Sequence, residues 1–264
     1  MADPQELLGL AEDVARRAGA LLRDGLARPR LAVDTKSTGT DMVTEMDRAA
    51  EALIVDGLLG IRRDDGMLGE EGTDRAGTSG VRWVVDPLDG TTNYLYRMAG
   101  FGVSIAAEVD GVITVGVVYD IVHDELFAAT RGGGATRDGA PITVSAQEDL
   151  ASALVGTGFA YDADRRRRQA EVLVTVLPRI RDIRRLGAAA VDLCSVACGR
   201  LDGYYERGLA AWDLAAGGLI ATEAGATVSG FTVGPASAAG VVAAAPGIAD
   251  ELRGLVHGAG AADA

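Results

Sequence analysis

Asp86 and Asp89 stand three residues apart at the end of the apolar run Val-Arg-Trp-Val-Val-Asp, which predicts a buried strand. Pro87 fixes the backbone between the two carboxylates. Oxygen ligands clustered in this way suit a hard divalent cation such as Mg²⁺. Gly90 and Thr91 follow and can begin a helix, whose free N–H groups would bind an anion such as phosphate. The segment predicts neighbouring metal and phosphate sites, and the alternative is a polar turn that caps a helix.

Two further segments carry carboxylates in contexts that fit the same chemistry. Glu70 and Glu71 lie between glycines in a polar segment that predicts a loop, and Asp213 stands at the start of a predicted helix of small apolar residues. Taken singly, the glutamates fit ordinary surface charge, and Asp213 fits a helix N-cap. Taken together with Asp86 and Asp89, they predict a metal site assembled from distant segments of the chain.

A second class of phosphatase also uses paired aspartates at a strand end. Enzymes of the haloacid dehalogenase type carry D-x-D-G-T, in which the first Asp is a covalent nucleophile. This chain has D-x-x-D-G-T, and the extra residue breaks the shared face that positions i and i+2 have in a strand. Those enzymes also use a basic residue, usually lysine, after the nucleophile, whereas the one lysine here, Lys36, precedes it. The pattern disfavours this class.

Segments that predict helices and strands alternate along the chain, with hairpins in the middle. Asp3, Pro4 and Glu6 form a helix start, and Asp110-Gly111 is a strong hairpin signal. This order predicts layered α and β structure with a mixed or antiparallel sheet. A break near 140–155 suggests two subdomains. Besides the first helix, which we expect to end at Gly25, helices are expected from about 44 to 57 or 60 and over 162–180, 188–198, 213–224 and 248–257. The run 165–168, four arginines, is expected to be a solvated helix face.

Composition bounds the class of protein. The chain has 264 residues, 48% of them hydrophobic, and a formal net charge of −13, which disfavours nucleic acid as a main partner. No apolar run is long enough for a membrane span, and the N-terminus lacks the pattern of a signal peptide. We therefore expect a cytoplasmic enzyme with reduced thiols at Cys194 and Cys198. Neither histidine, His123 nor His257, lies in a motif, so a histidine base or a zinc site is disfavoured.

Three motifs resemble those of the inositol monophosphatase family, which are lithium-sensitive, magnesium-dependent phosphatases. They are GEEG at 69–72, WVVDPLDGTTNY at 83–94 and WDLAAGGLIATEAGA at 212–226; the family pattern K-x-x-x-x-D-x-V-T-x-x-D is matched by Lys36, Asp41, Val43, Thr44 and Asp47. The resemblance spans about residues 5–257. It implies an αβαβα sandwich like that of the fructose-bisphosphatases, formed by residues 1–264 with subdomains 1–145 and 146–264, and a homodimer.

The resemblance also implies roles for individual residues. Glu70, Asp86 and the carbonyl of Leu88 would hold one Mg²⁺, and Asp86, Asp89 and Asp213 a second. A third, weaker ion would touch Glu70. Thr91, Glu70 and Asp47 would activate water. Substrate contacts would come from Lys36, Leu88, Asp89, Gly90, Thr91, Gly187, Ala188, Ala189, Glu206 and Asp213. Ala188 departs from the Ser or Thr common in the family, which puts the substrate preference in doubt.

The expected reaction is hydrolysis of myo-inositol 1-phosphate, a small phosphorylated polyol, by metal-activated water. The same chemistry on histidinol phosphate, fructose 1,6-bisphosphate or adenosine 3′,5′-bisphosphate is the alternative. A nucleotide would need aromatic or basic contacts near Glu206, where Tyr204 and Tyr205 are candidates although core packing fits them better. A third hypothesis is that the chain is a non-enzymatic interaction protein that keeps the fold. It predicts loss of the metal-binding carboxylates, and all of them are present.

Overall fold

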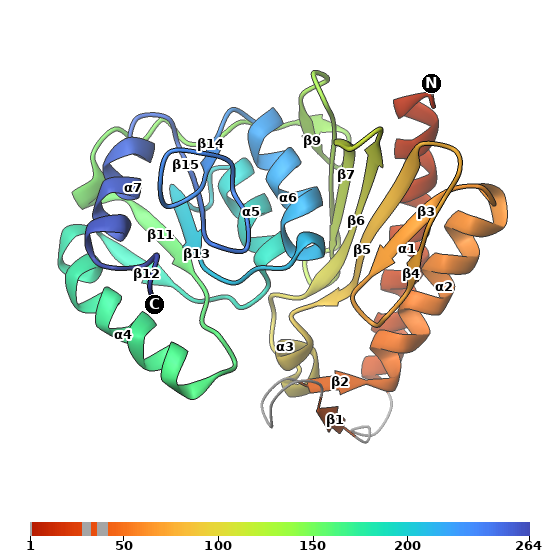
Figure 1. The fold of residues 1–264 in the computed structure, drawn as a ribbon, viewed down its shortest axis with the longest axis horizontal. Helices are drawn as coiled ribbons and strands as arrows, with labels where there is room; N and C mark the ends of the chain where they lie inside the picture. The colour runs from red at the N-terminus through yellow and green to blue at the C-terminus, as the bar shows by residue number, and fades with distance from the viewer. Residues whose placement is uncertain (1, 28–32, 36–41) are drawn as a thin grey trace.

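The computed structural model describes residues 2–27, 33–35 and 42–264. Five layers succeed one another in Figure 1: a pair of helices, a large sheet, a second pair of helices, a smaller sheet and an outer pair of helices. This arrangement confirms the predicted αβαβα sandwich. Three groups of buried apolar side chains fill the spaces on either side of the two sheets. Within the described ranges, no helix is long and apolar enough to cross a membrane.

The large sheet has eight strands in the described chain, in the order β10-β9-β8-β7-β6-β5-β3-β4. All neighbouring pairs are antiparallel except β3 and β5, which are parallel. The helices α1 (Pro4–Leu26) and α2 (Glu45–Ile61) cover its outer face. The strands are β3 (Gly66–Gly69), β4 (Asp74–Arg75), β5 (Val81–Asp89), β6 (Gly102–Val109), β7 (Val112–Asp120), β8 (Glu125–Thr130), β9 (Ala135–Arg137) and β10 (Ala140–Pro141).

Helix α1 (Pro4–Leu26) begins as predicted, with the Asp3 carboxylate accepting the N–H of Gln5 at 2.9 Å. Its apolar residues recur at helical spacing and are buried against the sheet. The predicted end at Gly25 is one residue early, because Gly25 lies inside the last turn. Helix α2 (Glu45–Ile61) continues through Gly57, as tertiary packing outweighs the low helix propensity of glycine.

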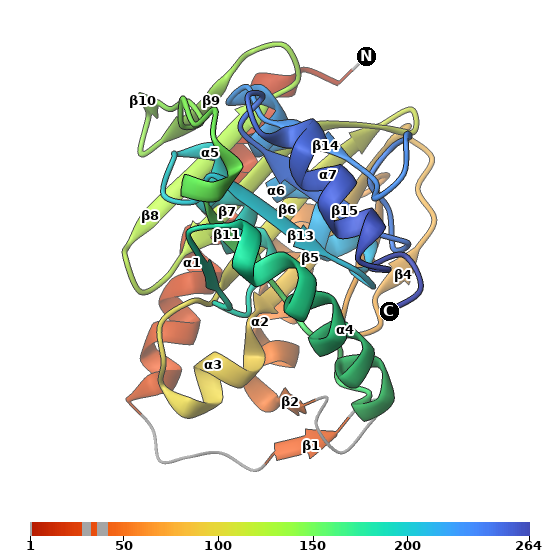
Figure 2. The same ribbon diagram turned by 90° about the vertical axis from the view of Figure 1, so that its left-hand side faces the viewer.

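Between the two sheets lie α5 (Ala189–Ala197) and α6 (Ala211–Glu223). The smaller sheet has the order β12-β11-β13-β15-β14, and α4 (Ala163–Val176) and α7 (Ala249–Gly258) lie across its outer face in Figure 2. Its strands are β11 (Leu154–Thr157), β12 (Asp182–Arg184), β13 (Gly203–Glu206), β14 (Thr227–Ser229) and β15 (Val241–Ala244). The short elements are β1 (Val33–Thr35), β2 (Met42–Thr44), α3 (Thr91–Tyr96), η1 (Leu150–Ser152) and η2 (Leu177–Arg179).

The Asp110-Gly111 hairpin is confirmed: both residues have positive φ (50° and 83°), and β6 pairs with β7 on either side. The segment 67–80 is only partly the predicted loop. Met67 and Leu68 belong to β3, which pairs with β5, and the short β4 then turns back along β3. Strands of four and two residues are too short for a sequence pattern to reveal.

Candidate active site

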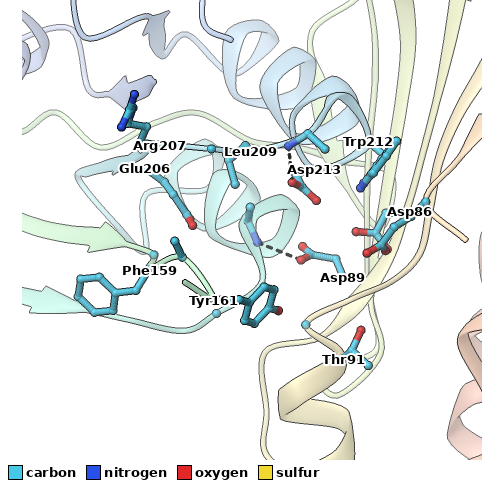
Figure 3. Close-up of a pocket in the computed structure, with 18 of the residues that line it drawn as sticks. Asp86, Asp89, Thr91, Phe159, Tyr161, Glu206, Arg207, Leu209, Trp212 and Asp213 are labelled. Carbon is cyan, nitrogen blue, oxygen red and sulfur yellow. Dashed lines mark hydrogen bonds between the residues drawn. The ribbon is translucent and has the colours of Figure 1, made fainter. Parts of the chain in front are cut away.

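A cavity of about 450 Å³ opens where β5, α3, α5 and α6 meet the loop before α4 (Figure 3). It is lined by residues from both halves of the chain. Of the predicted site residues, the lining includes Glu70, Asp86, Leu88, Asp89, Gly90, Thr91, Gly187, Ala189, Glu206 and Asp213. Asp47 and Ala188 are buried outside the lining, and Ala188 packs toward Gly90. Lys36 lies outside the described residues.

The parallel strands β3 and β5 explain why Glu70 and Asp86 meet. Parallel strands end at the same edge of a sheet, and Gly69 pairs with Val85 in this register. Glu70 N–H extends the pairing by donating to the Val85 carbonyl at 3.1 Å. The next residue on each strand therefore carries its carboxylate to the cavity. A shift of register between Asp86 and Asp89 in the β5–β6 pairing follows at once and turns the chain toward Asp89.

The carboxylate of Asp89 holds the start of α5. It accepts the N–H of Ala189 at 3.2 Å and that of Ala190 at 2.7 Å, and Figure 3 shows it pointing at the helix. Ala188, the N-cap residue of α5, has no side chain that can cap the helix. Asp89 therefore supplies, from 100 residues away, the cap that a Ser or Thr at 188 would provide locally.

Asp213 has the corresponding position on α6. Its carboxylate accepts the N–H of Ala210 at 2.7 Å, just before the helix begins. Asp213 thus lies in the first turn, as its third residue and not as the N-cap, because α6 begins two residues before the predicted start. The helix also carries Trp212 to the cavity rim. Both helices of the middle layer thus begin at the cavity with an aspartate against their first backbone N–H groups.

The carboxylates of this cluster repel one another, and burial strengthens the repulsion. Burial raises the pKa of Asp86 well above its ordinary value, and the charges of Glu70, Asp89 and Asp213 add to that rise. Burial also raises the pKa of Asp89, with Asp213 the largest charged contribution. Asp86 is 2% exposed and Asp89 7% exposed. Four carboxylate groups held together this way form a donor set that fits a hard divalent cation.

Thr91 lies beside the cluster and links it to α2. Its hydroxyl is 2.9 Å from Asp47 Oδ1 and 3.1 Å from the Leu88 carbonyl, and both Thr91 and Asp47 are buried. The Leu88 N–H donates in turn to Asp86 Oδ1 at 3.0 Å. Asp47 and Thr91 are 44 residues apart in sequence, so no spacing rule could have paired them.

On the far side of the cavity, Glu206 ends β13 with its side chain directed inward. Burial raises the pKa of Glu206, while the Tyr204 hydroxyl, which donates to it, and the charges of Arg185 and Arg165 oppose the rise. Tyr204 and Tyr205 are buried, as core packing requires. Asp192 lies near this group, fully buried, with one carboxylate oxygen lacking a hydrogen-bond partner among the described residues.

Sequence reasoning missed several residues of the site. Glu51 of α2 is 5% exposed and accepts the N–H of Glu71 at 2.8 Å and both the N–H and the hydroxyl of Thr73, at 3.1 and 2.6 Å. It thereby holds the loop that carries Glu70. The expectation of a solvated face at 165–168 is wrong for Arg165, which lines the cavity. The residues Phe159, Tyr161, Arg185 and Arg207 also line it, and no motif marks them.

A second group of metal-binding residue types lies outside the cavity. His123, which stands alone in the sequence, has its Nδ1 2.7 Å from Asp120 Oδ2, and Glu125 is close to both. Both oxygens of Glu125 accept from Arg200 at 2.6 Å. These contacts form a polar network at the end of β7 and the start of β8.

Comparisons with known proteins agree with the geometry. Residues 3–259 match the inositol monophosphatase family. The inositol-1-monophosphatase of Mycobacterium leprae is 46% identical over 95% of this chain and 93% of its own. The Nus factor SuhB of Escherichia coli is 40% identical over 86% of each chain. The crystal structure of the extragenic suppressor protein SuhB from Bartonella henselae superposes with a TM-score of 0.91, at 36% identity, over 95% of this chain and 98% of that one. A match of this extent in sequence and fold shows that the chain belongs to the inositol monophosphatase family.

Proposed function

We propose that the chain is a Mg²⁺-dependent phosphomonoesterase that hydrolyses myo-inositol 1-phosphate to inositol and phosphate. The carboxylate cluster carries this proposal. Burial and mutual repulsion raise the pKa values of Asp86 and Asp89, and cations would relieve that repulsion. Glu70, Asp86 and the Leu88 carbonyl would hold one ion, Asp86, Asp89 and Asp213 a second, and Glu70 a third. Two divalent ions would offset the charge of four carboxylates.

Bound there, Mg²⁺ would lower the pKa of a coordinated water and stabilise the charge that develops on the phosphate. The residues around the ion would position the attacking water. Thr91, whose hydroxyl is 2.9 Å from Asp47 Oδ1, donates to Asp47 and can then accept a hydrogen bond from the attacking water. Glu70, which also lines the cavity, would take up the proton of that water. The pairing of Thr91 with buried Asp47 supports this role.

The phosphate would lie against the backbone N–H groups of Gly90 and Thr91, at the first turn of α3. Attack by water in line with the ester bond releases the alcohol, and no covalent intermediate is needed. Glu206 and the turn Gly187-Ala188-Ala189 would face the hydroxyls of the inositol ring. Gly187, Ala189 and Glu206 all line the cavity, which supports the assignment. Lys36 is the remaining proposed contact.

Other substrates and roles remain as alternatives to this proposal. Phe159, Tyr161 and Arg165 line the cavity together with Glu206, which favours bisphosphates and nucleotides over histidinol phosphate among the alternative substrates. A role as an interaction protein is disfavoured because the carboxylate cluster is complete. The name Nus factor borne by the Escherichia coli relative nevertheless makes that role the second candidate.

Phosphate release from a panel of esters tests the proposal. The panel is myo-inositol 1-phosphate, histidinol phosphate, fructose 1,6-bisphosphate and adenosine 3′,5′-bisphosphate, each with Mg²⁺ and with EDTA. We expect Mg²⁺-dependent release, fastest with the inositol ester. Asp89→Asn should lower kcat/KM by more than about 100-fold, because a metal ligand is lost. Asp110→Asn is the matched control, since its exposed turn position accepts asparagine. Release in EDTA, or near-normal turnover by folded Asp89→Asn, would contradict the assignment.

A further inference from the structure

Strand β13 carries two tyrosines whose side chains lie on opposite faces of the smaller sheet. Tyr204 packs in the apolar group between the two sheets, and Tyr205 packs in the group that α4 and α7 cover. Both are buried, with exposed fractions of 0% and 5%. A fully enclosed tyrosine needs a partner for its hydroxyl, because burying an unpaired polar group costs free energy. The partner of the Tyr204 hydroxyl is the carboxylate of Glu206.

The hydroxyl of Tyr204 acts as a donor to Glu206. Burial raises the pKa of Tyr204 well above its ordinary value, and the charges of Glu206 and Asp192 add to that rise. The phenol therefore keeps its proton throughout the neutral range, and it has one proton to donate. That proton goes to Glu206 Oε2. The buried Oδ1 of Asp192 has no hydrogen-bond partner among the residues that the structure describes, so Tyr204 does not divide its donation between the two carboxylates.

Glycines of β11 and of the segment after it make room for this pair. A Cβ at Gly158 would overlap both carboxylate oxygens of Glu206, so any side chain there would displace the group. A Cβ at Gly156 would lie 3.1 Å from the ring of Tyr204 and 2.8 Å from Leu201. The Glu206 carboxylate therefore lies between the phenol hydroxyl and bare backbone, and these contacts restrict its orientation.

One oxygen of Glu206 remains for a ligand. Oε2 accepts from Tyr204, whereas Oε1 accepts no hydrogen bond from any residue in the described ranges. The side chain lines the cavity and is directed inward in Figure 3. An ionised carboxylate oxygen is only an acceptor, so Oε1 can recognise a donor on the ligand. The donors of a polyol phosphate are its hydroxyl groups.

We propose that Tyr204 is a positioning residue that makes the cavity selective for phosphate esters of polyols. By holding Glu206 Oε2, it directs Oε1 at one hydroxyl group of the alcohol, and an ester that lacks this hydroxyl gains nothing from the contact. The proposal rests on the proposed function, because the phosphate of the same ester must lie at the carboxylate cluster. Glu206 lies across the cavity from Asp86, so the contact contributes to binding and not to the chemical step.

Two esters, one with hydroxyl groups and one without, test this role: myo-inositol 1-phosphate and phenyl phosphate, each in Mg²⁺. Tyr204→Phe keeps the ring and removes the hydroxyl. We expect it to raise KM for the inositol ester about tenfold, the size of one hydrogen bond to a charged group. The kcat for that ester, and both constants for phenyl phosphate, should change little. Tyr205→Phe is the matched control, because it makes the same change at the next residue of β13, outside the cavity lining.

A double-mutant cycle shows whether Tyr204 acts through Glu206. Glu206→Ala should itself raise KM for the inositol ester, and adding Tyr204→Phe to it should have no further effect. Gly158→Ala displaces the same carboxylate from the other side and should reproduce the selective rise in KM. Three results would overturn the role: an unchanged KM in Tyr204→Phe, equal losses for both esters, or an undiminished effect of Tyr204→Phe in the Glu206→Ala background.

The proposed function can fail separately from this role. If neither ester releases phosphate in Mg²⁺, the proposed function is wrong, and calorimetric titration with myo-inositol 1-phosphate in Mg²⁺ decides the role of Tyr204. Binding that Tyr204→Phe weakens about tenfold, and that Tyr205→Phe leaves unchanged, supports the role. Equal binding by the wild type and Tyr204→Phe, or no binding by the wild type, refutes it.

Discussion

The hydroxyl of Thr91 can donate only one hydrogen bond, yet it lies within reach of both Asp47 and the Leu88 carbonyl. If its proton goes to Asp47, its lone pairs are free to orient water. We predict that Thr91→Val lowers kcat about 100-fold, the usual size of such an effect, with little change in the Mg²⁺ concentration for half-maximal rate. Thr91→Ser should keep most of the activity. A Thr91→Val enzyme with normal kcat would remove the hydroxyl from the mechanism.

The raised pKa of Asp86 predicts a pH effect on stability. A carboxyl group whose pKa is higher in the folded chain stabilises the fold while it is protonated, and that contribution is lost as pH rises through the folded pKa. In EDTA, Asp86→Asn should therefore be more stable than the wild type at neutral pH, with the difference shrinking toward about pH 4, near the ordinary pKa. Urea unfolding at several pH values measures this. A constant difference across pH would contradict it.

Single residues were predictable where chemistry and local pattern coincide. Asp86 and Asp89 follow an apolar strand, and Asp213 lies at the start of a helix, so residue type and position in the element together indicated a metal site. For Arg165 and Glu51, residue type and position gave no such indication. An arginine in a run of four is typical of a helix surface, and a glutamate at a buried helical position is visible only when its partners on the 69–73 loop are known.

At the scale of elements, Glu51 makes the β3–β4 turn dependent on α2. Its carboxylate receives three hydrogen bonds from Glu71 and Thr73. We predict that Glu51→Gln lowers the free energy of unfolding by about 1–3 kcal/mol, because an amide nitrogen meets these donors. It should also raise the Mg²⁺ concentration for half-maximal activity as Glu70 loses its position. Asp56→Asn, exposed on the same helix, is the control. An unchanged Mg²⁺ requirement would limit Glu51 to a structural role.

Long elements with a strong pattern were predictable, and short ones held by partners were not. The helix from Pro4 and the hairpin at Asp110-Gly111 carry their signals locally. The strand β3 is four residues long, and its existence depends on pairing with β5, where each residue meets one 16 positions further along, as Gly69 meets Val85. The parallel pairing that brings Glu70 to Asp86 depends on tertiary structure. The sequence therefore predicted both residues as metal ligands but not the strand pairing that places them together.

At the scale of the whole molecule, an exposed apolar patch supports the expected homodimer. Tyr96, Met98 and Leu186 are 57%, 60% and 37% exposed. Asn93 ties their segments together by donating to the carbonyls of Gly100 and Leu186, each at 2.6 Å. We propose that this patch lies in the interface. Sedimentation should give a dimer for the wild type and a monomer for Met98→Glu, with Val174→Glu on α4 as the control. A monomeric wild type would contradict the proposal.

The subdomains 1–145 and 146–264 also remain a proposal. The packing supports one cooperative unit, because α6 from the second part lies against β5, β6 and β7 of the first. A single unfolding transition followed by both tryptophan fluorescence and circular dichroism is the expected result. Trp83 lies in the large sheet and Trp212 at the cavity, so two separate transitions would report subdomains that unfold independently.

Both helices of the middle layer begin at carboxylates that are proposed to hold cations. Asp89 caps α5 and Asp213 caps α6, and these two helices are what joins one sheet to the other. A cation at the cavity would therefore stabilise the helix layer that joins the two sheets. The Mg²⁺ concentration would then set the lifetime of the folded chain as well as its catalytic rate. At a Mg²⁺ concentration 100 times its Kd, the gain would be about 2.7 kcal/mol, and the first turns of α5 and α6 should show it earliest, as slower amide exchange.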